Sequence, residues 1–285
     1  MLHQEKYDAL CRNLAELGSV IVAYSGGADS ALLLKVAHDT LGDQALGVIG
    51  LSPSYSSDER EQALAFAREW RLPVLEICTE EMENPQYVAN AGNRCYYCKT
   101  ELFDKLEAVR RERSFAVVVD GFNVDDEGDY RPGVQAAREH AVRHPLQEAG
   151  LTKAEIRDIS RALGLKTWDK PAMPCLSSRV PVGTPIQIGT LRQIDESEQA
   201  LRSLGFRQLR VRHHGKLARI EVPIEDLPRL IEPGIREQVV QAIKQAGYQF
   251  VTLDLAGYRM GSVNPVVMAS STSRSPALSG LSQNA

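Results

Sequence analysis

Near its amino terminus the chain reads Val20-Ile-Val-Ala-Tyr-Ser-Gly-Gly-Ala-Asp-Ser30, in which a short apolar, β-branched run leads directly into a glycine-rich loop. Residues 31–39 follow with apolar side chains at helical spacing, so a strand, a loop and a helix are predicted in that order. The alternation continues: we expect further strands over 45–50, 73–78 and 116–120, and helices over 57–70 and 95–113. Short strands separated by long helices predict a parallel, doubly wound α/β sheet with its ligand at the carboxyl ends of the strands.

The loop between that first strand and helix has the composition of an anion-binding site. Gly26 and Gly27 let the backbone approach a ligand closely, and the helix that follows adds partial positive charge. The hydroxyls of Ser25 and Ser30 can donate to the same oxygens. Because Asp29 would repel a bound anion, the pattern implies a divalent cation, Mg²⁺, between them. The loop lacks the lysine of a Walker motif, and a plain glycine turn is the alternative interpretation.

Composition excludes several classes of protein. The 285 residues include 37 acidic and 33 basic side chains, a net charge of −4, which argues against coating nucleic acid or an anionic membrane. No apolar run approaches the roughly 20 residues of a membrane span, and the polar start of the chain is not typical of a secretory signal. We therefore expect a globular cytoplasmic protein of about two domains, with neither a membrane nor a nucleic acid as its partner.

The second half of the chain predicts a different organisation. Thr152-Lys-Ala-Glu155 is a capping box that opens a helix, and the proline-rich stretch 170–179 follows it. Beyond it we expect a small α+β domain with an antiparallel sheet. Its expected elements are a helix over 187–204, strands over 207–214, 216–222 and 248–255, and helical stretches over 224–231 and 235–246. The predicted organisation is a domain over 1–170, a second over 171–268, and a serine-rich disordered tail over 269–285.

The five cysteines are an odd number in a chain without an export signal, which argues against a disulfide framework. Cys175 lies in the proline-rich stretch beside Ser178 and Arg179, and a nearby guanidinium favours a reactive thiolate. The alternative is a buried cysteine that packs as a small hydrophobic side chain. Cys95 and Cys98 form a CxxC pair, and three thiolates meeting at one site would suit an iron–sulfur cluster or zinc. A redox pair, a persulfide relay and an idle pair on a helix are the alternatives.

A basic segment lies in the predicted hairpin of the second domain. Strand alternation places Arg210, Arg212 and His214 on one face, and Arg219 and Glu221 share a face of the partner strand. The hairpin is thus predicted to have an apolar face packed on helices and a cationic face with one carboxylate. Arginine pairs suit bidentate recognition of phosphate. A solvated strand face is the alternative.

The Ser-Gly-Gly-Ala-Asp-Ser loop after the first strand resembles the pyrophosphate loop (PP-loop) of the ATP pyrophosphatase superfamily. Members of that superfamily cleave ATP between the α and β phosphates and adenylate a substrate oxygen, which turns it into a leaving group. Asp120-Gly-Phe-Asn-Val-Asp-Asp126 looks like the acidic loop of the superfamily, near metal and substrate. The resemblance implies an ATP site with Mg²⁺ on Asp29 and Asp125. The ATP-binding residues it implies are Ser25, Gly26, Gly27, Asp29 and Ser30.

Further motifs stand in order along most of the chain. They are Asp129-Tyr-Arg-Pro-Gly133, His144-Pro-Leu146, Leu151-Thr-Lys-Ala-Glu-Ile-Arg157, Trp168-Asp-Lys-Pro-Ala172, Cys175-Leu-Ser-Ser-Arg179, Arg210-Val-Arg-His-His214 and Ala218-Arg-Ile-Glu-Val222. Together they resemble the LarE family of ATP-dependent sulfur transferases, which act in synthesis of the nickel-pincer cofactor of lactate racemase. The resemblance implies a PP-loop domain over 1–170 and a substrate-binding, sulfur-transfer domain over 171–268.

The same resemblance implies the reaction and its residues. The substrate would be a pyridinium-3,5-dicarboxylate mononucleotide whose carboxylates become thiocarboxylates. Sulfur would come either from Cys175 itself, left as dehydroalanine, or from a [4Fe–4S] cluster held by Cys95, Cys98 and Cys175. The family's hexamers imply a homo-oligomer. The residues implied for the substrate phosphate are Ser178, Arg179, Arg210 and Arg212, with Glu198 and Glu221 nearby.

Three other activities are compatible with a PP-loop. An amide-forming synthetase of the NAD or GMP synthetase kind would need none of the three cysteines. A tRNA thiolation enzyme is disfavoured by the acidic charge balance and by the lack of an added basic RNA-binding module. A non-catalytic nucleotide-binding module would release no pyrophosphate.

Overall fold

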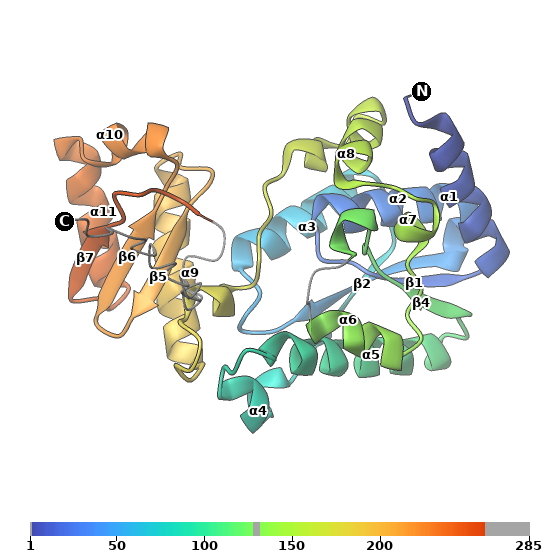
Figure 1. The fold of residues 1–285 in the computed structure, drawn as a ribbon, viewed down its shortest axis with the longest axis horizontal. Coiled ribbons are helices and arrows are strands. Elements are labelled where there is room, and N and C mark those ends of the chain that lie inside the picture. Colours follow the sequence, from blue (N-terminus) through green and yellow to red (C-terminus); the bar gives the residue numbers. More distant parts are fainter. Residues whose placement is uncertain (1, 128–131, 260–285) are drawn as a thin grey trace, which may run out of the picture.

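A four-stranded parallel sheet forms the centre of the larger domain in the computed structural model, which describes residues 2–127 and 132–259 (Figure 1). Its strand order is β3-β2-β1-β4, and all three pairings are parallel. The strands are β1 (Val20–Ala23), β2 (Ala45–Leu51), β3 (Val74–Cys78) and β4 (Val117–Val119). The prediction of a parallel α/β sheet is confirmed, and every strand lies close to its predicted range.

Helices cover both faces of this sheet because the β1 side chains are apolar on both sides (Figure 1). Val20 and Val22 belong to one buried cluster, whereas Ile21 and Ala23 belong to another. The first cluster includes side chains of α1 (Gln4–Leu17), α2 (Ala28–Leu41), α3 (Ser57–Glu69), α7 (Pro145–Glu148) and α8 (Lys153–Ala162). The second includes side chains of α5 (Arg94–Glu112) and α6 (Pro132–Glu139). The doubly wound arrangement follows from this double-sided burial.

The smaller domain has a three-stranded sheet in the order β5-β6-β7. Its elements are α9 (Ile188–Ser203), β5 (Arg210–His214), β6 (Leu217–Glu221), α10 (Leu227–Leu230), α11 (Pro233–Gln245) and β7 (Phe250–Leu253). The predicted hairpin is confirmed, since β5 and β6 are antiparallel, but β7 pairs parallel to β6. The expected antiparallel sheet is therefore wrong in part. Helices α10 and α11 lie between β6 and β7 in the chain, and a crossover of that kind lets two strands pair in parallel.

The segment between the two domains carries little regular structure. It runs from η4 (Lys166–Asp169) to η5 (Leu176–Arg179), and the predicted boundary after residue 170 falls within it. A small apolar cluster joins η5 to α9 and to α4 (Pro85–Val88) of the larger domain. Helices α4, α6 and α7 were not predicted, nor were the short turns η1 (Gly42–Gln44), η2 (Glu81–Glu83) and η3 (Val124–Asp126). The turn η6 (Ile224–Asp226) and α10 fall within the helical stretch predicted over 224–231. The predicted tail over 269–285 lies outside the described residues.

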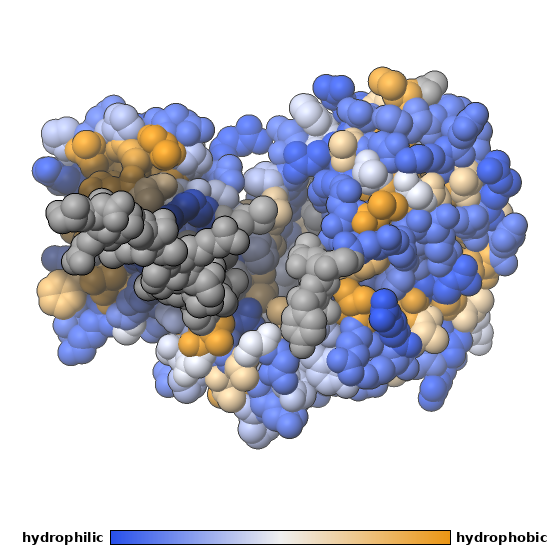
Figure 2. Space-filling view, in the orientation of Figure 1, coloured by the Kyte–Doolittle hydropathy of each residue, from blue (hydrophilic) through white to orange (hydrophobic). Residues whose placement is uncertain are grey.

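The capping box at the start of α8 is confirmed: Thr152 Oγ1 accepts from the backbone of Glu155, and the Glu155 carboxylate accepts from the backbone of Thr152. Among the described residues, no helix is long and apolar enough to cross a membrane. Figure 2 shows a largely hydrophilic surface in this view, with apolar patches on the smaller domain. Exposed apolar side chains of that domain include Ile224, Ile231, Phe250 and Leu255.

Candidate active site

The PP-loop connects the carboxyl end of β1 to the first turn of α2. Gly26 has a φ of 73°, and a Cβ built on it would lie 2.6 Å from the Cβ of Ala63 in α3, so no larger residue fits. The hydroxyls of Ser25 and Ser30 lie 3.1 Å apart across the loop. Tyr55 donates its hydroxyl to the Ser25 carbonyl at 3.0 Å. The loop is therefore held in one conformation by α3 and by the segment before it.

Asp29 lies in the first turn of α2 and meets a lysine that sequence analysis missed. Its Oδ2 accepts from Lys153 Nζ, at the start of α8, and its Oδ1 is buried without a hydrogen-bond partner among the described residues. A buried carboxylate oxygen without a partner is costly unless a ligand satisfies it. A hard cation such as Mg²⁺ prefers oxygen donors of this kind. Asp29 therefore fits the cation that its position in the loop implied.

In the acidic loop after β4, Asp120 and Asp125 bind different parts of the protein. Asp120 Oδ1 accepts from His144 Nδ1 at 2.7 Å and from the backbone of Phe122 at 3.1 Å. Asp125 is exposed, and its Oδ2 accepts from the backbone N–H of Lys153 at 2.7 Å, where α8 begins. One oxygen of Asp125 is thus already engaged. Both Asp120 and His144 stand within the sequence motifs, but no role was predicted for either residue.

A cavity of about 720 Å³ opens where these segments meet. Its walls combine the PP-loop, the end of β2, the acidic loop, the first turns of α5 and the segment before Cys175. Lining residues that matter for chemistry are Ser25, Asp29, Ser30, Cys95, Lys99, Asp120 and His144. Pro174 also lines it, so the peptide that carries Cys175 forms part of the wall. Parallel α/β sheets commonly bind ligands at this edge, as the sequence predicted.

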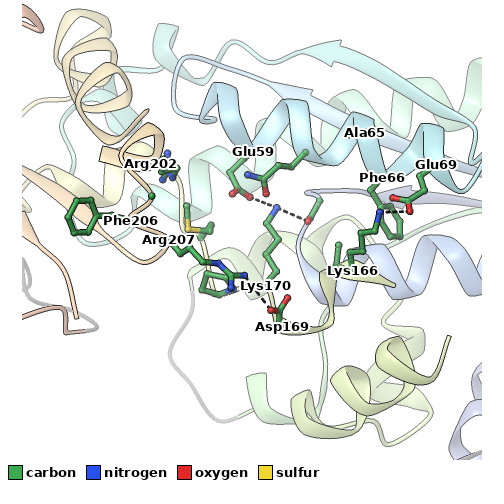
Figure 3. A pocket seen from close by; sticks show the side chains of 16 residues that line it. Glu59, Ala65, Phe66, Glu69, Lys166, Asp169, Lys170, Arg202, Phe206 and Arg207 are labelled. Carbon is green, nitrogen blue, oxygen red and sulfur yellow. Dashed lines mark hydrogen bonds and ion pairs between the residues drawn. The ribbon is translucent and has the colours of Figure 1, made fainter. Parts of the chain in front are cut away.

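A second cavity of about 530 Å³ lies between α3, the 166–173 segment and the end of α9 with the loop that follows it (Figure 3). Its charged side chains are paired: Lys170 Nζ lies 2.8 Å from Glu59, and Lys166 Nζ lies 2.8 Å from Glu69. Lys170 also donates to the carbonyl of Gly26 at 3.1 Å. The segment between the domains is therefore fastened directly to the PP-loop.

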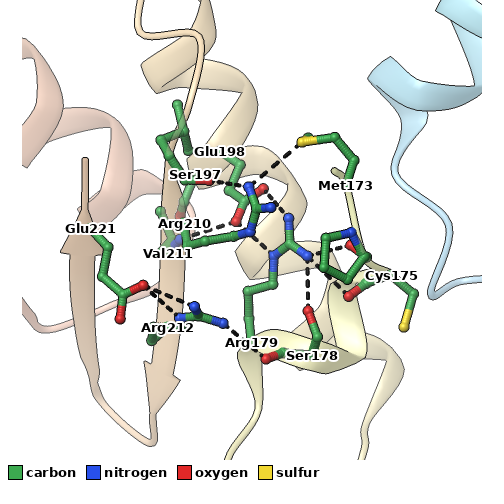
Figure 4. A network of polar contacts seen from close by, with 12 residues as sticks. Met173, Cys175, Ser178, Arg179, Ser197, Glu198, Arg210, Val211, Arg212 and Glu221 are labelled. Carbon is green, nitrogen blue, oxygen red and sulfur yellow. Dashed lines mark hydrogen bonds and ion pairs between the residues drawn. The ribbon is translucent and has the colours of Figure 1, made fainter. Parts of the chain in front are cut away.

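Cys175 precedes η5 and is half-buried, so it does not pack as a fully buried hydrophobic side chain. Its carbonyl accepts from Arg179 Nη1 at 3.0 Å, and the next residue, Leu176, donates its N–H to the Ser54 carbonyl at 2.8 Å. The guanidinium expected near Cys175 is present, and it holds the backbone of that residue (Figure 4).

The two cysteines of the CxxC pair lie in different surroundings. Cys95 is exposed at the start of α5 and lines the cavity beside the PP-loop. Cys98 packs against the cluster of Tyr87 and Leu176; burial raises the pKa of its thiol to about 12, and negative charge on Cys175 acts in the same direction. Among the described residues, no three cysteine, histidine or acidic side chains form a group that could hold one metal ion.

The predicted cationic face of β5 is covered by protein. Arg210 and Arg212 are 1% and 4% exposed, which excludes a solvated strand face. Arg212 lies 2.9 Å from Glu221 and also donates to the Ser178 carbonyl (Figure 4). Strand alternation correctly placed these arginines on one face, but it carries no information on what packs against that face, here the 172–178 segment.

Arg210 differs from its neighbours because its hydrogen-bond acceptors among the described residues are neutral. It donates to the carbonyl of Ala172 at 2.8 Å and lies over the ring of Tyr258. Burial and the positive charge of Arg179 together lower the pKa of Arg210 to about 10, although the negative charge of Glu198 acts in the opposite direction. A buried cation of this kind favours an anion nearby.

Glu198 of α9 is the central acid of this network and is completely buried. It accepts two bonds from Arg179, each 2.9 Å, one from Arg202 at 2.9 Å and one from the backbone of Val211 at 3.0 Å (Figure 4). Burial alone would raise the pKa of Glu198, but the charge and hydrogen bonds of Arg179 hold it below the ordinary value. Glu198 thus joins η5, α9 and β5.

The parallel sheet, with a glycine loop that follows its strand β1, is that of a PP-loop α/β protein. The chain is 35% identical over 260 residues to the pyridinium-3,5-bisthiocarboxylic acid mononucleotide synthase of Lactiplantibacillus plantarum, covering 91% of this chain and 94% of that protein. It is 44% identical over 264 residues to an uncharacterized protein of Synechocystis sp., covering 93% and 98%. An uncharacterized protein of Methanocaldococcus jannaschii is 30% identical over 262 residues, covering 91% and 99%. No protein-family model matches the chain.

All three relatives align with nearly the whole chain. The protein belongs to the LarE family, that of the pyridinium-3,5-bisthiocarboxylic acid mononucleotide synthase. The resemblance read from the sequence is therefore confirmed.

Replacement of Glu198 by glutamine should lower the free energy of unfolding by about 3–5 kcal/mol, because it leaves the buried Arg179 without its carboxylate partner and removes one of the two partners of Arg202. Glu196→Gln, an exposed change on the same helix, is the control and should have little effect. Since the folded-state pKa of Glu198 is lowered, its contribution is present above the ordinary carboxyl pKa and is lost as the pH falls. Urea unfolding at pH 7 and near pH 3 measures both effects; a difference that grows in acid would contradict this account.

Proposed function

We propose that this protein is an ATP-dependent sulfur transferase that adenylates the carboxylates of a pyridinium-3,5-dicarboxylate mononucleotide and converts them to thiocarboxylates. The product would serve the nickel-pincer nucleotide cofactor of lactate racemase. One observation carries the proposal: the PP-loop and the peptide preceding Cys175 line the same cavity. A substrate carboxylate that is activated at the PP-loop would therefore lie in the same cavity as the peptide that carries the Cys175 thiol.

In the first step a substrate carboxylate oxygen attacks the α-phosphorus of ATP, and pyrophosphate leaves. We assign the phosphates to the backbone of Gly26 and Gly27 and the hydroxyls of Ser25 and Ser30, at the positive end of α2. Mg²⁺ would neutralise charge that develops on the phosphates. A site for Mg²⁺ at Asp29 is supported by its Oδ1, which has no hydrogen-bond partner among the described residues. At Asp125, Oδ2 accepts from the start of α8, so Oδ1 is the oxygen assigned to the ion.

In the second step a sulfur nucleophile, either the Cys175 thiolate or a sulfide, attacks the acyl carbon, and AMP leaves. If Cys175 is the donor, cleavage of its Cβ–S bond with loss of the α-proton then yields the thiocarboxylate and leaves dehydroalanine. If a [4Fe–4S] cluster on Cys95, Cys98 and Cys175 is the donor, it would supply an inorganic sulfide instead. Cys98 packs against the apolar cluster that contains Leu176, the residue after Cys175, which supports the proximity of two of these thiols.

The substrate phosphate is assigned to Arg210 and Arg212, with the Ser178 hydroxyl and Arg179 beside them. Support comes from Arg210, a buried cation whose hydrogen bonds within the described part of the chain go to neutral acceptors. Glu198 and Glu221 would orient the arginines rather than touch the phosphate, because both carboxylates are already bound to guanidinium groups. Arginine forks favour phosphate because they donate two parallel bonds.

We further propose that the protein works in the cytoplasm as a homo-oligomer, a hexamer by its family resemblance. Apolar side chains exposed on the smaller domain, including Ile224 and Phe250, support association of copies through that domain.

Asp29→Asn should abolish pyrophosphate release without unfolding the protein, because it removes the charge that would hold Mg²⁺. Metal ions contribute several kcal/mol to such steps, so we expect a loss of roughly 100-fold or more. The measurement is pyrophosphate release with ATP, Mg²⁺ and the dicarboxylate mononucleotide. Asp43→Asn, an exposed carboxylate beyond the same helix, is the control. Near-normal release by Asp29→Asn would refute the assigned role.

Cys175→Ala should still release pyrophosphate but form no thiocarboxylate, because adenylation precedes the thiol's attack. Both products are measured in one reaction by mass spectrometry and a pyrophosphate assay. Cys78→Ala, an exposed cysteine on β3, serves as the matched control and should transfer sulfur normally. Sulfur transfer by Cys175→Ala would show that the thiol has no part in it.

Purification without oxygen should distinguish the two sulfur sources. We expect a brown protein that contains iron, and loss of the colour on replacing Cys95 or Cys98 by serine, because thiolates of this spacing suit a cluster. A colourless protein that accumulates dehydroalanine at position 175 during turnover would instead support the sacrificial route. Iron analysis, absorption spectra and peptide mass spectrometry provide the readouts.

A further inference from the structure

Helix α9 of the smaller domain contacts the first turn of α3 in the larger domain. The N-cap residue of α3, Ser56, makes no side-chain cap bond. Asp195 of α9 takes that place: its Oδ2 accepts from the Ser57 hydroxyl at 2.7 Å and from the Ser57 backbone at 3.4 Å. A carboxylate at this position satisfies backbone donors and the helix dipole. The start of α3 is therefore completed by the other domain.

Arg202, two turns further along α9, forms an ion pair across the same interface. One of its terminal nitrogens lies 2.9 Å from Asp58 Oδ2 in α3, and the other lies 2.9 Å from Glu198 Oε2 in α9. Glu198 in turn holds Arg179, which donates to the Cys175 carbonyl. A continuous series of charged contacts thus runs from the first turn of α3 to the backbone of the reacting cysteine.

The opposite side of α3 touches the PP-loop. Ala63 lies against Gly26, as the 2.6 Å approach to a Cβ built there shows, and the Ala63 carbonyl accepts from the Tyr24 hydroxyl at 3.1 Å. Glu59 holds Lys170, which donates to the Gly26 carbonyl (Figure 3). One rigid helix therefore contacts the loop assigned to ATP and, through Asp58, the network that holds Cys175.

We propose that Asp58 and Arg202 are positioning residues that set the distance between an acyl-adenylate at the PP-loop and the Cys175 thiol. The inference rests on the proposed function, in which the larger domain holds ATP and the segment between the domains carries the Cys175 thiol. The attacking sulfur must come within about 3–3.5 Å of the acyl carbon. When the ion pair is lost, the adenylate still forms, but water attacks the acyl carbon, and AMP and the original carboxylate result.

The test is a coupling ratio, pyrophosphate released per thiocarboxylate formed. Oxygen-free protein in excess is mixed with ATP, Mg²⁺ and the dicarboxylate mononucleotide, and both products are followed through a single turnover. Asp58→Asn should release pyrophosphate within about twofold of the wild-type rate and raise the ratio roughly 10-fold, since small misplacements cost one to two orders of magnitude. Glu61→Gln, an exposed carboxylate one turn further along α3, should leave the ratio unchanged, and Asp58→Glu should restore it in part.

Arg202→Gln also removes the ion pair with Glu198, so it should raise the ratio at least as much as Asp58→Asn does. The double variant should raise the ratio no further than Arg202→Gln alone, because both changes break the same Asp58–Arg202 ion pair. A normal ratio in Asp58→Asn, or equal losses of pyrophosphate and thiocarboxylate, would overturn the positioning role. Absence of pyrophosphate from the wild-type protein would instead overturn the proposed function itself. Asp58 is partly exposed, so its variant tests the inference even where Arg202→Gln fails to fold.

Discussion

The structure depends on how one buried carboxylate is compensated. Glu198 has no exposed surface, and a charge in that position is costly unless cations and hydrogen-bond donors surround it. Its oxygens accept hydrogen bonds from Arg179, Arg202 and the backbone of Val211, which belong to η5, α9 and β5 respectively. Because the compensation requires all three together, the geometry around Cys175 is fixed along with the packing of the smaller domain. Such a network specifies one arrangement more than it adds stability.

The PP-loop is constrained in a comparable way from the other side. Gly26 adopts a positive φ and leaves no room for a side chain beside Ala63, so α3 determines where the loop backbone points. The partnerless oxygen of Asp29 and the neighbouring Lys153 give the same loop one site for a cation and one fixed positive charge. The PP-loop and the segment before Cys175 therefore line one cavity, although about half of the chain separates them. Helix α3 contacts the PP-loop through Ala63 and that segment through the ion pair of Glu59 with Lys170.

Much of the larger domain was predictable because its elements are strongly patterned. The run Val20–Tyr24 is apolar at every position, which is typical of a strand buried on both faces, and the capping box at Thr152 marks a helix start by local chemistry alone. Predictions were weaker where local signals are short or absent. Helix α4 has one turn, and β7 pairs parallel to β6 because of the helices between them, a long-range property that no window of residues contains.

The sequence by itself determined the class of sheet, the nucleotide-type glycine loop, the three cysteines and the family, because each is carried by residue types at fixed local spacing. Tertiary structure decided which side chains meet: that Lys153 reaches Asp29, that the β5 arginines are covered rather than open to water, and that Cys95 and Cys98 lie in different surroundings. The physical reason is that burial and charge pairing depend on the elements packed against a residue. Periodicity assigns a face to each side chain, whereas only the folded chain supplies the partner for that face.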